Sequence, residues 1–307
     1  MRIVVVGSSN TDMIIKVPRI PKPGETILGG VFSTAPGGKG ANQAVAAARA
    51  GGEVAFIAKI GRDTLGDESL RRFIEDRIDT TFVYRDDSAP SGVAQILVAE
   101  NGENSIAVAS GSNSNLRPQD IRNAKEWIIS ADIVLVQLEI PLDTVIEVVT
   151  LSHRLNKTII LNPAPAIDAP DNLLSHISFL TPNQTETELL TGIAVVDRDS
   201  AREAGRQLCS KGVATVTITM GAEGVFVFSR QEELFRRAYK VKAVDTTAAG
   251  DVFNGALAVA LSEGKGIGDA VSFANAAAAL SVGKLGAQSS IPSRTEIDNF
   301  LSDRLAG

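Results

Sequence analysis

Short apolar segments alternate with helix-forming segments along most of this chain, and this order constrains the fold more than any other feature. The β-rich runs lie at residues 3–6, 53–59, 133–136, 158–161, 177–180 and 214–219. The helical patterns between them lie at 40–50, 66–77, 118–130, 142–155, 183–191 and 200–211. Apolar strands that alternate with helices are typical of parallel strands covered on both faces. We therefore predict an α/β fold, a three-layer sandwich with a mostly parallel central sheet and helices on both faces.

Two stretches depart from this alternation. Residues 13–33 and 91–108 contain strand-like residues but no helical pattern, and 100–103 has the composition of a hairpin turn. We predict that inserts at about 11–36 and 88–109 form a small β-sheet. This sheet would belong to a single domain of residues 1–307 and would act as a lid over a strand edge.

Composition argues against several classes of partner and site. The net charge is -6 and no basic block occurs, so we expect no nucleic-acid partner. No apolar run is long enough to cross a membrane, and we expect no membrane partner. Cys209 is the only cysteine, which fits a reducing, cytoplasmic location. Only two histidines are present, so a histidine-based catalytic or metal site is poorly supplied.

The segment 245–251, Asp-Thr-Thr-Ala-Ala-Gly-Asp, is the most informative motif. A strand-like run at 239–244 leads into this loop of small residues, and a helix rich in Ala and Leu follows. Small residues at a helix start let an anion reach the free N–H groups of the first turn. Asp251 at that point suits a base that accepts a hydroxyl proton while a phosphoryl group is held beside it. An ordinary helix N-cap is an equally good reading of Asp251 from this segment alone.

A second cluster of small residues, 36–43, contains Lys39 and Asn42. It lacks the first glycine and the hydroxyl residue of a Walker phosphate loop, and a simple helix start is one interpretation. The alternative is that Lys39 and Asn42 present a cation and an amide to one ligand. Upstream, Asn10 and Asp12 follow the first strand and suit the hydroxyl groups of a sugar, although an Asx turn also explains them.

Two further clusters end strands in the second half of the chain. In 181–186, Asn183 and Glu186 are placed to cap the following helix, and capping is a sufficient explanation of both. In 217–224, a glycine-containing turn follows the strand, which by itself is a weak signal. Their functional weight comes from the other motifs.

Together these motifs identify the chain as similar to the ribokinase-like family of carbohydrate kinases, of the phosphofructokinase-B type. The resemblance covers essentially the whole chain. It rests on the segments 37–44 and 245–251, with support from Asn10-x-Asp12, from 161–165, from Pro182-Asn183-x-x-Glu186 and from Thr219-x-Gly221, in the family's order. It implies a large α/β domain with a β-sheet lid and ATP-dependent phosphorylation of a sugar hydroxyl, with O5 of D-ribose as the first expectation.

The resemblance also implies roles for individual residues. The catalytic group would be Asp251, with an anion hole from the N–H groups of Ala248, Ala249 and Gly250. The sugar would contact Asn10, Asp12, Gly38, Lys39, Asn42, Glu139 and Asp251. The nucleotide would lie along Asn183, Thr219, Gly221, Gly224, Gly250 and Asn275.

The resemblance also implies two metal-ion sites. Glu186 would help to hold Mg²⁺ through water. A monovalent cation, usually K⁺, would lie beside the anion hole, at the positions Asp245, Thr247, Ser281, Lys284, Gly286 and Ser290, several of which would use backbone carbonyls.

Assembly and substrate leave alternatives open. The β-rich inserts contain exposed-strand candidates at 14–17 and 93–98, and the resemblance points to a homodimer formed by the two lid sheets; a monomer is the alternative. The sugar could instead be deoxyribose, fructose or another. A catalytically silent sugar-binding or nucleotide-binding regulator is a further alternative, against which the presence of Lys39, Gly250 and Asp251 argues.

Overall fold

The computed structural model describes residues 2–167 and 170–305. Nine strands form one large sheet with the spatial order β13-β12-β11-β10-β9-β8-β1-β4-β5. In chain order its strands are β1 (Arg2–Val6), β4 (Glu53–Gly61), β5 (Val83–Asp86), β8 (Ile133–Gln137), β9 (Thr158–Asn162), β10 (Phe179–Leu180), β11 (Thr215–Thr219), β12 (Gly224–Ser229) and β13 (Glu233–Arg237). All neighbours from β11 to β5 pair in parallel, and only the pairs β11–β12 and β12–β13 are antiparallel, so β12 alone runs opposite to the other strands.

Helices cover both faces of this sheet because its central strands are apolar on both sides. In β1, Ile3 and Val5 belong to one hydrophobic core, whereas Val4 and Val6 belong to the other. Residues on the first face pack against α1 (Lys39–Arg49), α2 (Thr64–Glu75), α9 (Ala249–Ser262), α10 (Ile267–Ser281) and α11 (Arg294–Leu305). Those on the second face pack against α3 (Pro118–Asn123), α4 (Lys125–Ser130), α5 (Leu142–Arg154), α6 (Asp171–Leu174), α7 (Gln184–Thr191) and α8 (Arg198–Ser210). The predicted sandwich is confirmed.

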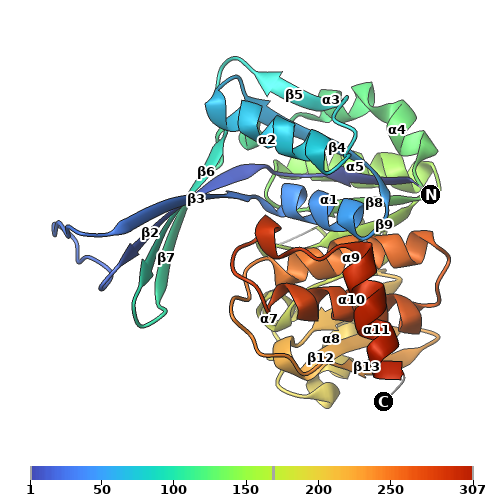
Figure 1. The fold of residues 1–307 in the computed structure, drawn as a ribbon. Helices are drawn as coiled ribbons and strands as arrows, with labels where there is room; N and C mark the ends of the chain where they lie inside the picture. The colour runs from blue at the N-terminus through green and yellow to red at the C-terminus, as the bar shows by residue number, and fades with distance from the viewer. Residues whose placement is uncertain (1, 168–169, 306–307) are drawn as a thin grey trace.

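A separate four-stranded sheet projects from one end of the body (Figure 1). Its order is β3-β2-β6-β7, formed by β2 (Asn10–Val17), β3 (Val31–Gly37), β6 (Gly92–Ala99) and β7 (Asn104–Ala109). The β6–β7 hairpin has its turn where the sequence predicts it. Short 3₁₀ segments follow at η1 (Gly111–Asn115), η2 (Gly221–Glu223) and η3 (Gln288–Ser290). The bounds of the inserts and the role of this sheet as a lid stay predictions.

Three sequence expectations differ from the structure. The run 239–244 forms no strand; the N–H of Val244 donates instead to the carbonyl of Val282, at 2.7 Å, in the loop after α10. The helical pattern 118–130 is divided into α3 and α4 at Ala124. The expected exposed strands 14–17 and 93–98 are the central strands β2 and β6, which are flanked on both sides and partly covered.

Helix α9 is buried along nearly its whole length and lies against α1 and α10 (Figure 1). It carries no charged residue after Asp251 within its span, as expected for a helix that is apolar on all sides. Gly255 allows it to approach α1 closely, because a Cβ there would lie 2.6 Å from the Cβ of Ala46. This contact brings the first turns of α1 and α9 together. Among the helices that the structure describes, none is long and apolar enough to cross a membrane.

Candidate active site

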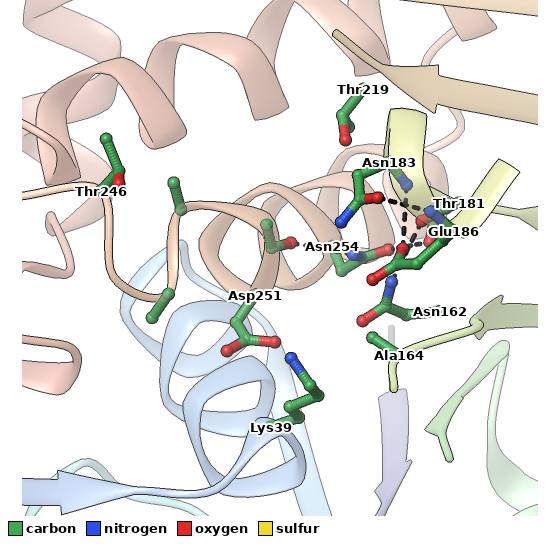
Figure 2. Close-up of a pocket in the computed structure, with 13 residues that line it drawn as sticks. Lys39, Asn162, Ala164, Thr181, Asn183, Glu186, Thr219, Thr246, Asp251 and Asn254 are labelled. Atoms are coloured by element: carbon green, nitrogen blue, oxygen red, sulfur yellow. Dashed lines mark hydrogen bonds between the residues drawn. The ribbon is translucent and has the colours of Figure 1, made fainter. Parts of the chain in front are cut away.

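A cavity of about 170 Å³ opens at the carboxyl edge of the large sheet, between the first turns of α1, α7 and α9 (Figure 2). In open α/β sheets, ligands bind at this edge because the loops after the strands converge there. Its lining comes from Lys39, Asn162, Ala164, Thr181, Asn183, Glu186, Thr219, Thr246, Ala248, Ala249, Gly250, Asp251 and Asn254. The structure thus brings together residues from five of the motifs that the sequence singled out.

Asp251 lies in the first turn of α9 but does not cap it. The N-cap is Ala248, in the left-handed conformation with φ 60°, and no side chain in the described part of the chain caps the helix start. The carboxylate, only 6% exposed, accepts hydrogen bonds from Nδ2 of Asn42 at 3.0 Å and from Nε2 of Gln43 at 2.9 Å. Burial raises the pKa of Asp251, and Lys39 with these two amides opposes that rise. The capping interpretation is therefore wrong.

The backbone at the start of α9 faces the cavity with few obstructions. A Cβ added at Gly250 would meet no atom within 4 Å. The N–H of Ala249 donates to the carbonyl of Thr246 at 3.2 Å, which closes the turn. Among the backbone hydrogen bonds in turns, loops and helix ends of residues 2–167 and 170–305, none has the N–H of Ala248, Gly250 or Asp251 as its donor. These three groups, more than Ala249, are free to bind an anion.

Lys39 is the one basic side chain of the cavity lining, and its ammonium group points toward Asp251 (Figure 2). Burial lowers the pKa of Lys39, but the charges of Asp251, Glu139 and Glu186 outweigh burial and raise it. Asp12 interacts with two of these carboxyl groups: burial, Glu139 and Asp251 raise its pKa to about 6. One ammonium among the three carboxyl groups of Asp251, Glu139 and Glu186 leaves an excess of acidic groups, which favours an added cation.

Two of the expected sugar residues, Asn10 and Glu139, lie near the start of the second sheet. Asn113 donates through Nδ2 to the backbone carbonyl of Ser9 at 3.2 Å and to Oδ1 of Asn10 at 2.8 Å. Because the carbonyl only accepts, this arrangement fixes both amides and leaves Nδ2 of Asn10 as a donor. Oε2 of Glu139 accepts from the N–H of Lys39 at 3.0 Å, so its carboxylate is held at the start of α1.

Gly38 allows the second sheet to approach α1. It has φ 89°, and a Cβ there would lie 2.6 Å from the backbone nitrogen of Asn10. Asn10 and Glu139 also line a cavity of about 350 Å³ on the side of the second sheet. Three of the expected sugar positions thus lie near Asp251: Lys39 on α1, Asp12 on β2 and Glu139 in the loop after β8.

A larger cavity of about 770 Å³ adjoins the first and contains the expected nucleotide residues. Asn183, Thr219, Gly221, Gly224, Gly250 and Asn275 all line it. Its other walls are largely apolar, formed by side chains such as Tyr239, Val241, Phe253 and Val282. Asn183 also caps α7: its Oδ1 accepts from the N–H of Glu186 at 2.8 Å, and Oε2 of Glu186 accepts from the N–H of Asn183 at 2.9 Å. Burial raises the pKa of Glu186, partly offset by Asn183 and Lys39.

Three of the six expected cation positions form one hydrogen-bonded unit. Oδ1 of Asp245 accepts from the N–H and the hydroxyl of Thr247, at 2.9 and 2.6 Å, and Oδ2 accepts from the N–H of Gly286 at 2.9 Å. Burial would raise the pKa of Asp245, but these bonds outweigh it and lower the pKa. The side chains of the other positions are directed elsewhere: Ser281 and Ser290 donate to nearby helix carbonyls, and Lys284 pairs with Glu296.

Several residues around Asp251 are not predicted as site residues by the sequence. Asn162 and Thr181 lie within recognised motifs, but the pattern gives neither of them a role. Asn254, one helical turn after Gly250, donates to its carbonyl at 2.8 Å, and Thr181 donates to Asn254 at 2.6 Å. Gln137 offered one signal, a polar residue at the end of the otherwise apolar strand β8.

Comparison with known proteins agrees with this geometry. The model of the pfkB family of carbohydrate kinases matches residues 1–294. The ribokinase of Haemophilus influenzae is 47% identical over 299 residues, which is 97% of this chain and 98% of that protein. The deoxyribokinase of Salmonella typhi is 38% identical, with 98% and 99% covered. The structure of Arabidopsis thaliana ribokinase complexed with ribose and ATP is similar with a TM-score of 0.93 and 33% identity, covering 97% of this chain and 98% of that one.

Proposed function

This chain belongs to the pfkB family of carbohydrate kinases, and on that premise we propose that it transfers the γ-phosphoryl group of ATP to O5 of D-ribose. The products are D-ribose 5-phosphate and ADP. The observation that carries the proposal is the buried carboxylate of Asp251, placed beside free N–H groups at the start of α9 and facing Lys39. A base and an anion cradle in contact are what phosphoryl transfer to a hydroxyl requires.

The chain's own residues account for the steps. Asp251 accepts the hydroxyl proton as the oxygen attacks the γ-phosphorus in line with the leaving ADP. The N–H groups at the start of α9 and the ammonium of Lys39 stabilise the charge on the transferred group. The apolar walls of the 770 Å³ cavity suit the adenine base, and its polar end near Asn183 and Thr219 suits the phosphates.

Two cations fit the donor groups. Glu186 would hold Mg²⁺ together with phosphate oxygens and water, the ligands this ion prefers, and the excess of carboxyl groups around Lys39 favours a divalent cation. Mg²⁺ supplies charge compensation on the phosphates. K⁺ would lie beside the Asp245 loop, where the ionised carboxylate and neighbouring carbonyls are suitable ligands. The hydrogen bonds that Asp245 accepts from Thr247 and Gly286 support that site, since they hold the loop before α9 in one shape.

Ribose is favoured over sugars that lack a hydroxyl. Asp12 can accept from two hydroxyl groups, and Asn10 presents a fixed donor. A missing hydroxyl leaves such buried groups unpaired, at a cost of about 1–3 kcal/mol each. Phosphorylation of 2-deoxyribose is the second candidate, and the Salmonella typhi deoxyribokinase at 38% identity is the observation that favours it.

We also infer a homodimer formed by the second sheet, in the cytoplasm. Large apolar side chains are exposed on its outer strands and at Leu28 in the loop between β2 and β3. The pairing register places Val31, Ile106 and Val108 on one face of the sheet and Phe32 on the other. The face with Val31, Ile106 and Val108 presents three exposed apolar side chains to water, which suits an interface. A second copy of the chain would cover it.

A coupled assay of ADP release tests the substrate. D-ribose, 2-deoxy-D-ribose and D-fructose are compared by kcat/KM at saturating ATP and Mg²⁺. We expect D-ribose to be preferred over 2-deoxy-D-ribose by roughly tenfold or more, from the cost of an unpaired group. Equal or greater efficiency with 2-deoxy-D-ribose or with D-fructose would assign the chain to another sugar. ADP release with none of the three, despite measurable sugar binding, would indicate a silent regulator.

A further inference from the structure

Two buried glutamines lie behind Asp251, and the reaction as described gives neither of them a role. Gln43 is in α1, Gln137 ends β8, and both are 0% exposed. Nε2 of Gln137 donates to Oε1 of Gln43 at 2.6 Å, and Nε2 of Gln43 donates to Oδ1 of Asp251 at 2.9 Å and to Oδ1 of Asn162 at 3.0 Å. One chain of amides therefore joins the central sheet to the base.

A backbone carbonyl fixes the orientation of the side-chain amides in this hydrogen-bonded series. Nδ2 of Asn162 donates to the carbonyl of Thr181 at 3.0 Å, and a carbonyl only accepts. Asn162 must therefore present Oδ1 to Gln43, so Gln43 must turn Nε2 toward both Asn162 and Asp251. Gln137 meets the remaining Oε1 of Gln43 with a donor. Every amide in the chain has one orientation that satisfies its neighbours.

The other carboxylate oxygen is held in the same way. Nδ2 of Asn42 donates to Oδ2 of Asp251 at 3.0 Å, and Nε2 of Gln288 donates to Oδ1 of Asn42 at 3.2 Å. Both oxygens of Asp251 thus receive a side-chain amide that a second amide orients. Amides do not titrate near neutral pH, so they stabilise the carboxylate without competing for the proton that it must accept.

Gln137 also carries an unfavourable contact that an apolar residue would avoid. Its Oε1 is buried and has no hydrogen-bond partner among the residues that the structure describes, and it lies against Gly7, where a Cβ would come within 2.1 Å of it. A buried unpaired acceptor destabilises a fold. If Gln137 served packing alone, an apolar side chain of similar size would serve better. Its bond to Gln43 is the feature that an apolar side chain could not supply.

We propose that Gln43 and Gln137 are positioning residues for the phosphoryl transfer: Gln137 orients the amide of Gln43, and Gln43 holds Asp251 in its reactive rotamer and in its ionised form. The inference rests on the proposed function only for the identity of the reaction. Burial raises the pKa of Asp251, and the bond from Gln43 is among the contacts that lower it. The charged groups around Asp251 are Lys39 from α1, Asp12 from β2, Glu139 after β8 and Glu186 from α7.

The test compares Gln43→Met and Gln137→Met with Val136→Ala. The methionines keep the length of the side chain and remove the amide. Val136 precedes Gln137 in β8 but belongs to the core on the opposite face, so its truncation destabilises the same strand without touching an amide. The readout is the pH dependence of kcat with saturating D-ribose and ATP, whose acid limb reports the base in the bound complex.

We expect the acid limb to move to higher pH by roughly one unit in Gln43→Met, since a bond to the charged form is lost. Gln137→Met should move it in the same direction by less, and Val136→Ala should leave it in place. KM for D-ribose should change by less than about twofold in both methionine variants, because the interaction acts on the base. A fall in kcat with an unmoved acid limb would overturn the proposal, as would an equal shift in Val136→Ala.

A second readout does not depend on turnover. Carboxyl ¹³C NMR titration of protein labelled in its aspartates, with Asp251 assigned by its loss in Asp251→Asn, measures the pKa of Asp251 directly in the protein without substrate. Gln137→Met should raise it while leaving both direct donors to Asp251 in place, so this variant decides the question if Gln43→Met does not fold. An unchanged Asp251 pKa in Gln137→Met would reject the proposal that Gln137 acts on Asp251 through Gln43. Wild-type protein inactive on D-ribose would reject the proposed function, and the titration would still decide whether Gln137 and Gln43 act on Asp251.

Discussion

Replacing Asp251 with Asn separates catalysis from folding in a way that the structure makes quantitative. The carboxylate accepts one amide on each oxygen, from Asn42 at 3.0 Å and from Gln43 at 2.9 Å. The side chain introduced by Asp251→Asn offers a single acceptor oxygen, so its NH₂ group would face one of the two NH₂ donors. An unpaired buried donor costs about 1–3 kcal/mol. The neutral amide also removes the cost of burying a charge, which acts in the opposite direction.

The two effects on stability therefore largely offset each other, and we expect the free energy of unfolding to change by less than about 2 kcal/mol. Turnover has no such compensation, because an amide cannot take up the hydroxyl proton. Loss of a general base typically lowers kcat by about two to four orders of magnitude. The affinity for D-ribose should change little, since the other sugar residues stay in place.

The assay measures ADP release with D-ribose, together with denaturant unfolding and calorimetric binding of the sugar. Asp197→Asn is the matched control, because Asp197 caps α8 at the surface through a bond to the N–H of Ser200 at 2.8 Å. Its turnover should equal that of the wild type. If Asp251→Asn kept a third or more of wild-type kcat, the carboxylate would not be the base and the reasoning from its environment would be refuted.

Three further outcomes follow from the same structure. Because the pKa of Asp12 is raised to about 6, its carboxyl group is protonated below that pH and loses acceptor capacity, so the Kd for D-ribose should rise as the pH falls through this value; Asp12→Asn should bind weakly at every pH, and a flat wild-type profile by calorimetry would contradict this. Asp245→Asn should raise the K⁺ concentration for half-maximal activity by roughly tenfold, equivalent to about 1.4 kcal/mol, and equal wild-type rates in K⁺ and in a bulky organic cation would reject the site. Light scattering should give twice the 32.2 kDa chain mass, and Ile106→Glu with Val108→Glu should halve it; a monomeric wild type would refute the interface.

The sequence by itself determined the architecture, because the central strands have apolar residues on both faces. The alternation of β1 between two cores is readable from four consecutive apolar residues, and parallel strands need intervening helices to connect them. The small residues before Asp251 likewise predict a helix start that is open to an anion. These are local properties, and short-range physical chemistry fixes them.

Tertiary structure decided what the local pattern left open. The apolar run 239–244 looks like a strand, but Tyr239 and Val241 are apolar because they line a cavity. The motif around Asp251 does not show whether its carboxylate caps the helix or is held away from the helix start. The distinction comes from Asn42 and Gln43, more than two hundred residues away, which α1 brings to the carboxylate because Gly255 lets the two helices approach. Contacts between distant segments depend on how whole elements pack, and no window of the sequence contains that information.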